Sequence, residues 1–167
     1  MELFQSYTVI SNRVLTTLKQ LGVSFEVIDC DPAFADTQIF CEHYGYSLAN
    51  SANVIVVVGK SKPRQFAACV LLATTRLDIN QCVRKRFNVR RASFASPEET
   101  KNLTGMEIGG VTVFSLPKSL PVWVDHRIME RKYIILGGGN RSLKLTPEVL
   151  RKIQNIDIVE GLAISPD

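Results

Sequence analysis

The stretch VIVVVGKSKPRQFAACVLL, residues 54–72, decides the fold. Its first five residues are all β-branched, the segment 59–63 carries the glycine and proline of a turn, and residues 66–72 are again apolar. This pattern predicts two adjacent strands joined by a hairpin loop. The second run is apolar at successive rather than alternate positions, so we expect it to be buried on both faces.

Helix signals lie on both sides of this hairpin. Capping residues are followed by apolar positions at helical spacing, and some of these runs are closed by a glycine. The predicted helix starts are Ser11, Thr37, Asp78 or Asn80, Ser96 and Thr146, and the closing glycines are Gly22, Gly45 and Gly105. Further short strands are predicted at 23–28, 112–116, 122–125, 133–136 and 142–145. Short strands without a full helix between each pair favour an α+β fold with a mixed, largely antiparallel sheet.

Composition limits the class of protein. A chain of 167 residues, 46% of them hydrophobic, is long enough for one sizeable core and short for two, so we expect a single domain over residues 1–167. The apolar runs are too short for a membrane span and the first residues are not basic, which predicts a soluble, cytoplasmic protein with no membrane partner. Four widely spaced cysteines without metal-ligand spacing indicate reduced thiols and no metal site.

Two glycine runs are the first candidates for a site. Gly109 and Gly110 precede the predicted strand 112–116, and Gly137, Gly138 and Gly139 follow the predicted strand 133–136. Glycine permits close approach of another backbone or a ligand, and consecutive backbone N–H groups can hold an anionic oxygen. A bulge or a glycine turn is the alternative for each run, and G-x-G-x-x-G spacing is absent.

Charged residues supply two further candidates. Asp125 ends the predicted strand 122–125, where it serves either a site or, as the alternative, a helix cap or an arginine partner. The net charge of +4 comes partly from two basic groups that can follow a phosphate backbone. The first group is Arg84, Lys85, Arg86, Arg90 and Arg91, and the second is Lys60, Lys62 and Arg64. A solvated helix C-terminus is the alternative for Arg84, Lys85 and Arg86. No nucleophile with an activating partner is visible.

The order of these pieces resembles the YbaK/prolyl-tRNA synthetase-associated editing domain family. The succession is Thr104-Gly105, Ile108-Gly109-Gly110-Val111, Val122-Trp123-Val124-Asp125, Gly137-Gly138-Gly139 and Leu145-Thr146-Pro147, with Thr37–Gly45 and Leu77-Asp78 upstream. The likeness extends over roughly residues 14–159 and is closer to the stand-alone members. It implies a YbaK-like fold in which short helices surround a mixed, largely antiparallel, barrel-like sheet.

The resemblance also implies an activity. Stand-alone members remove a wrongly attached small amino acid from tRNA; water attacks the ester with help from the ribose hydroxyl, and no cofactor is used. Carried over, Gly109 and Gly110 contact the aminoacyl-adenosine together with Val111, Thr112 and Val113. Gly137, Gly138 and Gly139 line the opposite wall, and Asp125 braces the pocket or binds the substrate amine. The partners implied are the acceptor end of aminoacyl-tRNA and a possible aminoacyl-tRNA synthetase.

Two positions depart from the family's pattern. Asn53 stands where many members carry a lysine that meets the terminal phosphate, and Val113 stands where the glycine loop commonly has proline. Asparagine donates a hydrogen bond without a charge, and valine leaves φ less restricted. The primary interpretation is therefore a trans-acting deacylase; the alternatives are a catalytically silent tRNA- or synthetase-binding module and a small-molecule pocket protein.

Overall fold

The computed structural model describes residues 2–29, 37–108, 110–137 and 141–166. Its α-helices are α1 (Glu2–Leu21), α2 (Thr37–Tyr44), α3 (Arg84–Phe87), α4 (Pro97–Thr104) and α5 (His126–Met129). Its strands are β1 (Glu26–Asp29), β2 (Ala52–Gly59), β3 (Gln65–Leu72), β4 (Arg76–Leu77), β5 (Ala92–Phe94), β6 (Val122–Asp125), β7 (Ile134–Gly137), β8 (Arg141–Leu145), β9 (Ile156–Val159) and β10 (Ala163–Ile164). Three 3-10 helices, η2 (Leu48–Asn50), η4 (Val113–Ser115) and η5 (Pro147–Lys152), and the π-helix η3 (Ile79–Val83) complete the described elements.

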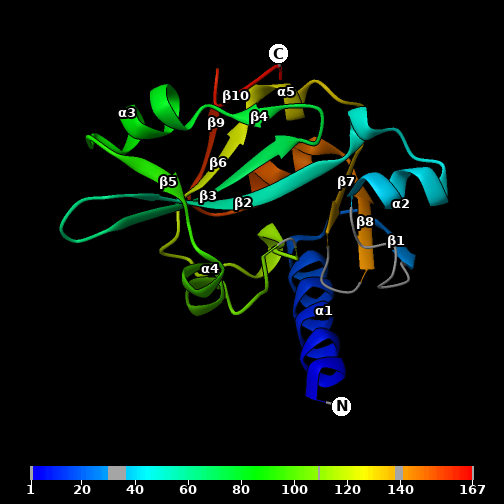
Figure 1. The fold of residues 1–167 in the computed structure, drawn as a ribbon. Coiled ribbons are helices and arrows are strands. Elements are labelled where there is room, and N and C mark those ends of the chain that lie inside the picture. The colour runs from blue at the N-terminus through cyan, green and yellow to red at the C-terminus, as the bar shows by residue number, and fades with distance from the viewer. Residues whose placement is uncertain (1, 30–36, 109, 138–140, 167) are drawn as a thin grey trace.

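The predicted hairpin is confirmed and forms the centre of the largest sheet (Figure 1). Strands β2 and β3 pair antiparallel over their whole length, from Ala52 opposite Leu72 to Gly59 opposite Gln65. The sheet has the order β5-β2-β3-β6-β9, and β6 and β9 run parallel to β3. Nearly every residue of β3 is buried, as expected for a strand covered on both faces.

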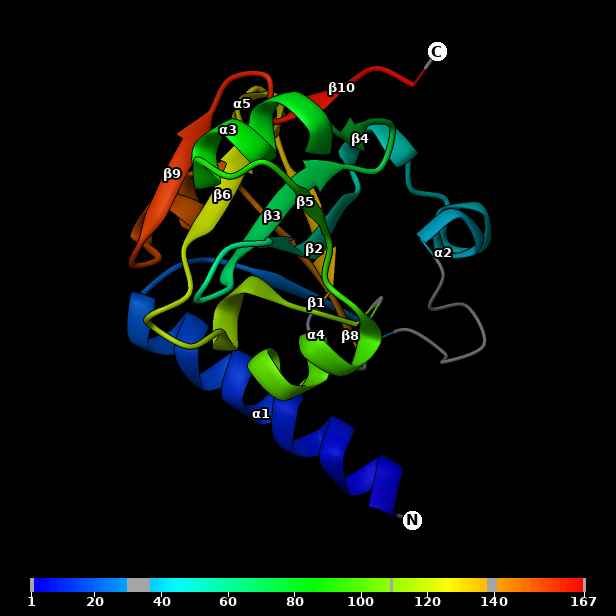
Figure 2. The ribbon, with the colours of Figure 1, turned by 60° about the vertical axis from the view of Figure 1, so that its left-hand side comes forward.

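Two hydrophobic clusters cover the two faces of this sheet. One face carries Val54, Val70 and Val124, against which α1 packs through Val14 and Leu18. The other face carries Val57, Leu71, Trp123 and neighbours, covered by Val83 and Phe87 from η3 and α3. Figure 2 shows α1 and α4 on one side of the sheet and α3 on the other. The alternation of side chains along β2 and β3 therefore assigns successive residues to different clusters.

The remaining strands form two smaller sheets, and the barrel-like arrangement expected from the sequence is not a closed barrel. Strands β1, β8 and β7 make an antiparallel three-stranded sheet, and β10 pairs with β4. Among the described residues, β7 meets β2 through a single parallel bridge between Ser51 and Ile135. One bridge does not continue the ladder, so the sheets do not close on each other. The mixed, largely antiparallel α+β architecture itself is confirmed.

Several predicted element starts are confirmed. Helix α2 begins at Thr37, and Asp78 caps η3 with its side chain. At α4, the Ser96 hydroxyl accepts a hydrogen bond from the Glu99 N–H, while the Glu99 carboxylate accepts one from the Ser96 N–H. The bond from the Ser96 backbone is the main reason that the pKa of Glu99 is lowered. This is the capping box that the sequence predicts, and Gly105 ends the helix with a φ of 73°.

Other boundaries differ from the prediction. Helix α1 begins at Glu2, so Ser11 lies inside it; serine costs only a few tenths of a kcal/mol in a helix interior, which the surrounding turns outweigh. Strand β1 occupies only the second half of the range 23–28. Residues 112–116 are not a strand, because Val113–Ser115 forms η4. Val111, Thr112, Val113 and Phe114 are all buried, which alternation along a surface strand does not explain.

Gly59 provides a test of the packing beneath the hairpin loop. A Cβ built on Gly59 would lie 2.8 Å from Cγ of Phe87, whose ring packs on Trp123 at a centroid distance of 4.8 Å. Because Phe87 is held on its other side, we expect Gly59→Ala to destabilise the fold by about 1–3 kcal/mol through overpacking. The measurement is urea unfolding. Gly110→Ala is the matched control, since its Cβ would meet only the Glu107 carbonyl oxygen at 3.5 Å. Equal stability of the two variants would contradict this packing.

Candidate functional site

Strand pairing is interrupted along the edge of β2 that faces away from β3. Strand β5 pairs with β2 at Val57–Gly59, and the Ala95 N–H donates to the Val56 carbonyl at 2.9 Å. At the other end of β2, the bridge from Ser51 to Ile135 brings in β7. Among the described residues, no strand pairs with this edge at Asn53–Ile55. The main sheet thus has a short opening, defined as this interruption in strand pairing between β5 and β7.

The two predicted glycine segments meet at this opening. Two residues beyond the parallel bridge lie Asn53 in β2 and Gly137 in β7, and Gly137 is exposed. A Cβ built on Gly137 would lie 4.0 Å from the carbonyl oxygen of Val111. The end of β7 and the loop before η4 are therefore neighbours, as expected for two walls of one site. Gly109, Gly138 and Gly139 lie outside the described residues.

The loop before η4 is anchored by its own backbone. The Gly110 N–H donates to the Glu107 carbonyl at 2.9 Å, so this amide is already occupied. Val111 and Val113 are buried in the cluster that contains Val54, and Thr112 is fully buried. The buried side chains of Val111, Thr112 and Val113, which are the predicted substrate contacts, form the support of the loop rather than its surface.

Asn53 approaches the opening from the other face. It lies opposite Leu71, which belongs to the cluster with Val57 and Trp123, whereas Val111 belongs to the α1-facing cluster. The half-buried Asn53 side chain and the glycine loop thus reach the β2 edge from opposite faces of the sheet. A molecule seated in the opening would have protein on both sides.

Asp125 is the most buried of the predicted polar site residues, with no exposed surface. Its Oδ1 accepts a hydrogen bond from the Ala163 N–H at 3.2 Å and lies 3.6 Å from Nδ1 of His126. Among the described residues, neither its Oδ2 nor the His126 Nδ1 has a hydrogen-bond partner. Asp125 therefore fastens β10 to the end of β6. No local pattern in the sequence indicates this bond, because its partners are 38 positions apart.

The predicted basic residues fall into two kinds. Arg86 donates to Asp157 at 3.1 Å and its guanidinium lies 4.8 Å above the Trp123 ring, while Arg64 pairs with Glu99 at 2.9 Å. These two arginines tie elements together. The exposed side chains of the other kind have no ion pair among the described residues: Lys60, Lys62, Lys85, Arg90 and Arg91. Half-buried Arg84 donates to the carbonyl of Asn80.

The basic groups are brought together by backbone pairing. The Lys60 N–H donates to the Arg91 carbonyl at 2.9 Å, which joins the β2–β3 loop to the segment before β5. Both segments project from the same side of the molecule in Figure 1. The two groups therefore lie next to each other on one surface.

A groove lies apart from the opening beside β2. A groove of about 780 Å³ runs between α1, η4 and η5, with Arg13, Lys118 and Lys152 among its lining residues. Asn53, Gly110, Gly137 and Asp125 do not line it. This groove is therefore separate from the opening beside β2.

In the described ranges, no helix combines the length and apolar character needed to cross a bilayer. The same residues contain no group of three or more His, Cys, Asp or Glu side chains arranged to hold a metal ion.

Comparisons with known proteins show which family the chain resembles. Residues 31–153 match the Aminoacyl-tRNA editing domain. The chain is 29% identical over 125 residues to the multifunctional Ser/Thr-tRNA deacylase ProXp-y of Escherichia coli strain K12, a match that covers 74% of each protein. The matched range contains Asn53, Gly110, Asp125 and Gly137.

Solved structures share the fold. The crystal structure of a hypothetical protein superposes with a TM-score of 0.81 at 22% identity, covering 91% of this chain and 99% of the other. The crystal structure of a putative trans-editing enzyme for prolyl tRNA synthetase superposes with a TM-score of 0.76 at 20% identity, covering 90% and 95%. At these identities the likeness supports the architecture alone.

Substitutions at Asp125 test its fastening role. Asp125→Ala leaves the Ala163 N–H buried without an acceptor, so we expect a loss of about 1–3 kcal/mol of unfolding free energy. Asp125→Asn keeps an acceptor oxygen for the Ala163 N–H, so its unfolding free energy should stay close to that of the unchanged protein. The measurement is urea unfolding of both variants. If alanine and asparagine are equally stable, the bond to Ala163 does not hold β10.

Proposed function

Since the chain belongs to the aminoacyl-tRNA editing domain family, we propose that it is a trans-editing hydrolase that deacylates tRNA carrying a wrongly attached small amino acid. The reaction adds water to the ester between the amino acid and the terminal ribose. It releases the free amino acid and restores the ribose hydroxyl. The relative ProXp-y, a Ser/Thr-tRNA deacylase, supports this reaction type.

The observation that carries the proposal is the meeting of two glycine-containing segments beside the start of β2. A Cβ built on Gly137, at the end of β7, would lie 4.0 Å from the Val111 carbonyl oxygen, in the loop that follows Gly110. A site of this kind suits an aminoacyl ester, because small residues admit the substrate's own backbone-like atoms. It also suits a reaction in which water is the nucleophile and the protein supplies position and polarity.

We assign stabilisation of the developing oxyanion to backbone N–H groups of the two glycine segments. The Gly110 amide already donates to Glu107, so the donors are its neighbours in the loop or in the segment after β7. Preorganised donors of this kind contribute roughly 3 kcal/mol each to lowering the barrier. The substrate's ribose hydroxyl assists the attacking water. For Asp125 we retain the bracing role, since its buried carboxylate orders the end of β6.

The departures at Asn53 and Val113 are compatible with catalysis. Val113 is the first residue of η4, a position that proline and other residues occupy equally well because its N–H has no helical partner. Asn53 can donate a hydrogen bond to the terminal phosphate region without a charge. The alternative of a catalytically silent binding module is not favoured, because the curated relative is a deacylase.

We infer further that the acceptor end of tRNA reaches the opening across the basic surface of Lys60, Lys62, Lys85, Arg90 and Arg91. Arg84 lies beside this surface, and Arg86 contributes charge while its guanidinium stays on Trp123. An aminoacyl-tRNA synthetase is a second proposed partner, which would hand over mischarged tRNA. The location proposed is the cytoplasm, where charged tRNA is made and used.

The first test is amino-acid release from tRNAs charged with Ala, Ser, Cys, Thr and Pro. We expect hydrolysis of at least one small-residue ester, and its loss in Gly110→Ala. The methyl group of this variant meets no protein atom closer than 3.5 Å, so the fold is kept and the obstruction falls on the substrate. Thermal unfolding of the variant is the control. Silence across the panel with tRNA still bound would support the binding module instead.

A second test addresses the position of the missing lysine. Asn53→Lys places a cation at the opening, so we expect tRNA to bind roughly 2- to 5-fold more tightly. The salt dependence should steepen by about one phosphate contact. Asn53→Gln is the neutral control. Equal affinities of the Lys and Gln variants would remove Asn53 from the phosphate site.

A further inference from the structure

An exposed aromatic side chain lies on the basic surface. Phe94, at the end of edge strand β5, is 55% exposed, which is unusual for a phenylalanine in a strand. It was not a candidate at the level of sequence, although Arg90 and Arg91 stand just before it. An aromatic residue close to a run of basic residues indicates a binding surface only when the ring is exposed to solvent, and exposure is known from the structure alone.

Strand pairing fixes the direction of Phe94. It lies opposite Val57 of β2, so both side chains point to the same face of the sheet. Asn53 and Ile55 point to that face as well, because they precede Val57 by four and two positions. Phe94 therefore points to the same face of the sheet as Asn53, and its partner Val57 lies ~13 Å along β2 from Asn53 at 3.3 Å per residue.

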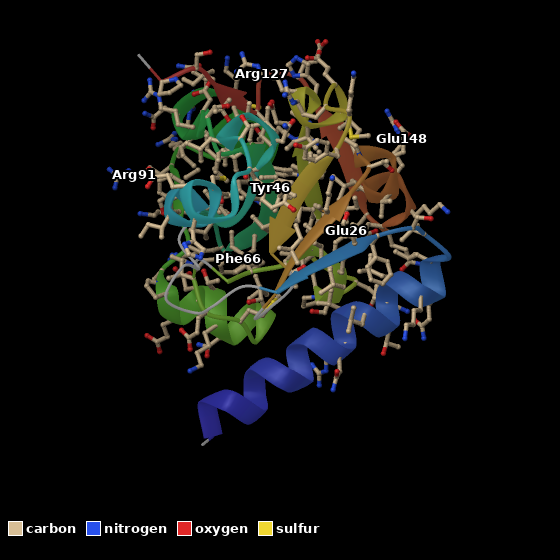
Figure 3. All side chains as sticks on the ribbon, turned by 90° about the vertical axis from the view of Figure 1, so that its right-hand side faces the viewer. Glu26, Tyr46, Phe66, Arg91, Arg127 and Glu148 are labelled. Atoms are coloured by element: carbon tan, nitrogen blue, oxygen red, sulfur yellow. The ribbon has the colours of Figure 1, made fainter. Side chains whose placement is uncertain are left out.

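Basic side chains lie beyond Phe94, on the side away from Asn53. Arg91, three residues before Phe94, is held against the β2–β3 loop by its carbonyl's bond from Lys60. Figure 3 shows the Arg91 side chain at the rim of the molecule, directed outward. Among the described residues, neither Arg91 nor Lys60 makes an ion pair. The order along the surface is thus cations, an exposed ring, and the opening at Asn53.

This arrangement matches the chemistry of an unpaired nucleic-acid strand. Such strands are bound by cations that follow the phosphates and by aromatic rings on which bases stack, and double helices cannot offer their bases in this way. A protein partner would favour an apolar patch, whereas the surroundings of Phe94 include Lys60, Arg90 and Arg91. Charge complementarity therefore favours RNA as the occupant.

We propose that Phe94 is a stacking platform for an unpaired base of the tRNA acceptor strand, upstream of the aminoacylated nucleotide in the opening. This inference rests on the proposed function and adds a binding residue to it. Phe94 takes no part in the chemistry; it holds the strand beside the basic surface, at the outer edge of the sheet. Every base has a π face, so this contact is tolerant of sequence.

The experiment compares two RNA hairpins of identical stem, one with an unpaired four-nucleotide 3′ strand and one blunt. Phe94→Ala should weaken binding of the hairpin with the unpaired strand ~5- to 150-fold, the range for losing one stacked base. Binding of the blunt hairpin should not change. Phe94→Leu is the matched variant, because it keeps an apolar side chain without a ring and should bind as weakly as alanine.

Two further variants separate stacking from charge. Phe94→Trp should bind the unpaired strand at least as tightly as the unchanged protein, with quenching of the new indole's fluorescence by that hairpin and not by the blunt one. The background is small, because the natural Trp123 is 5% exposed. Arg91→Ala should weaken both hairpins and lower the salt slope by about one contact.

The outcomes distinguish this inference from the proposed function. Unchanged affinity in Phe94→Ala, or full affinity in Phe94→Leu, overturns the stacking role, while ester hydrolysis by the unchanged protein would leave the deacylase proposal intact. Loss of binding to the unpaired strand in a protein that hydrolyses none of the charged tRNAs would keep the platform and overturn the activity. Failure of the unchanged protein to bind either hairpin overturns the stacking platform, and the hydrolysis assay on charged tRNAs then decides the deacylase proposal.

Discussion

The antiparallel pairing of β2 with β3 is the constraint on which the rest of the structure depends. Eight residue pairs in one register divide the apolar side chains between two faces, and each face then requires its own cover. Helix α1 supplies one cover, and η3 with α3 supplies the other. A slip of one residue would exchange Val54 for Asn53 on the α1 side, so packing and site geometry are set by the same register.

The same register explains how a site with little side-chain chemistry arises. Strand β5 pairs only with the end of β2 and β7 bridges only the residue before its start, so the strand pairing along this edge is interrupted where Gly137 and the loop before η4 come together. The catalytic power assigned to such a site comes from fixed dipoles and from the substrate's own hydroxyl, which agrees with the absence of a recognisable nucleophile motif in the sequence.

Local signals made much of the architecture predictable. The residues that specify the strand before Gly59 and the capping box at Ser96 lie within a few positions of each other in the sequence. Both predictions are confirmed. The residues 112–116 were assigned wrongly, because burial of Thr112 and its neighbours depends on α1, far away in the chain. The candidate site itself could be approached only by resemblance. Asn53, Val111 and Gly137 come from three distant segments, and no short pattern indicates that they meet.

The shortness of the opening in β2 has a consequence for self-association. An uncovered strand edge is a template on which another copy of a chain can add a strand, and proteins commonly protect such edges with charge, bulges or brevity. Here the interruption in strand pairing spans three residues, with β5 at one end and β7 at the other. A strand of ordinary length, about five residues, does not fit between them. Brevity therefore protects this stretch of β2 from the addition of a strand, and the outer edges of the main sheet remain those of β5 and β9.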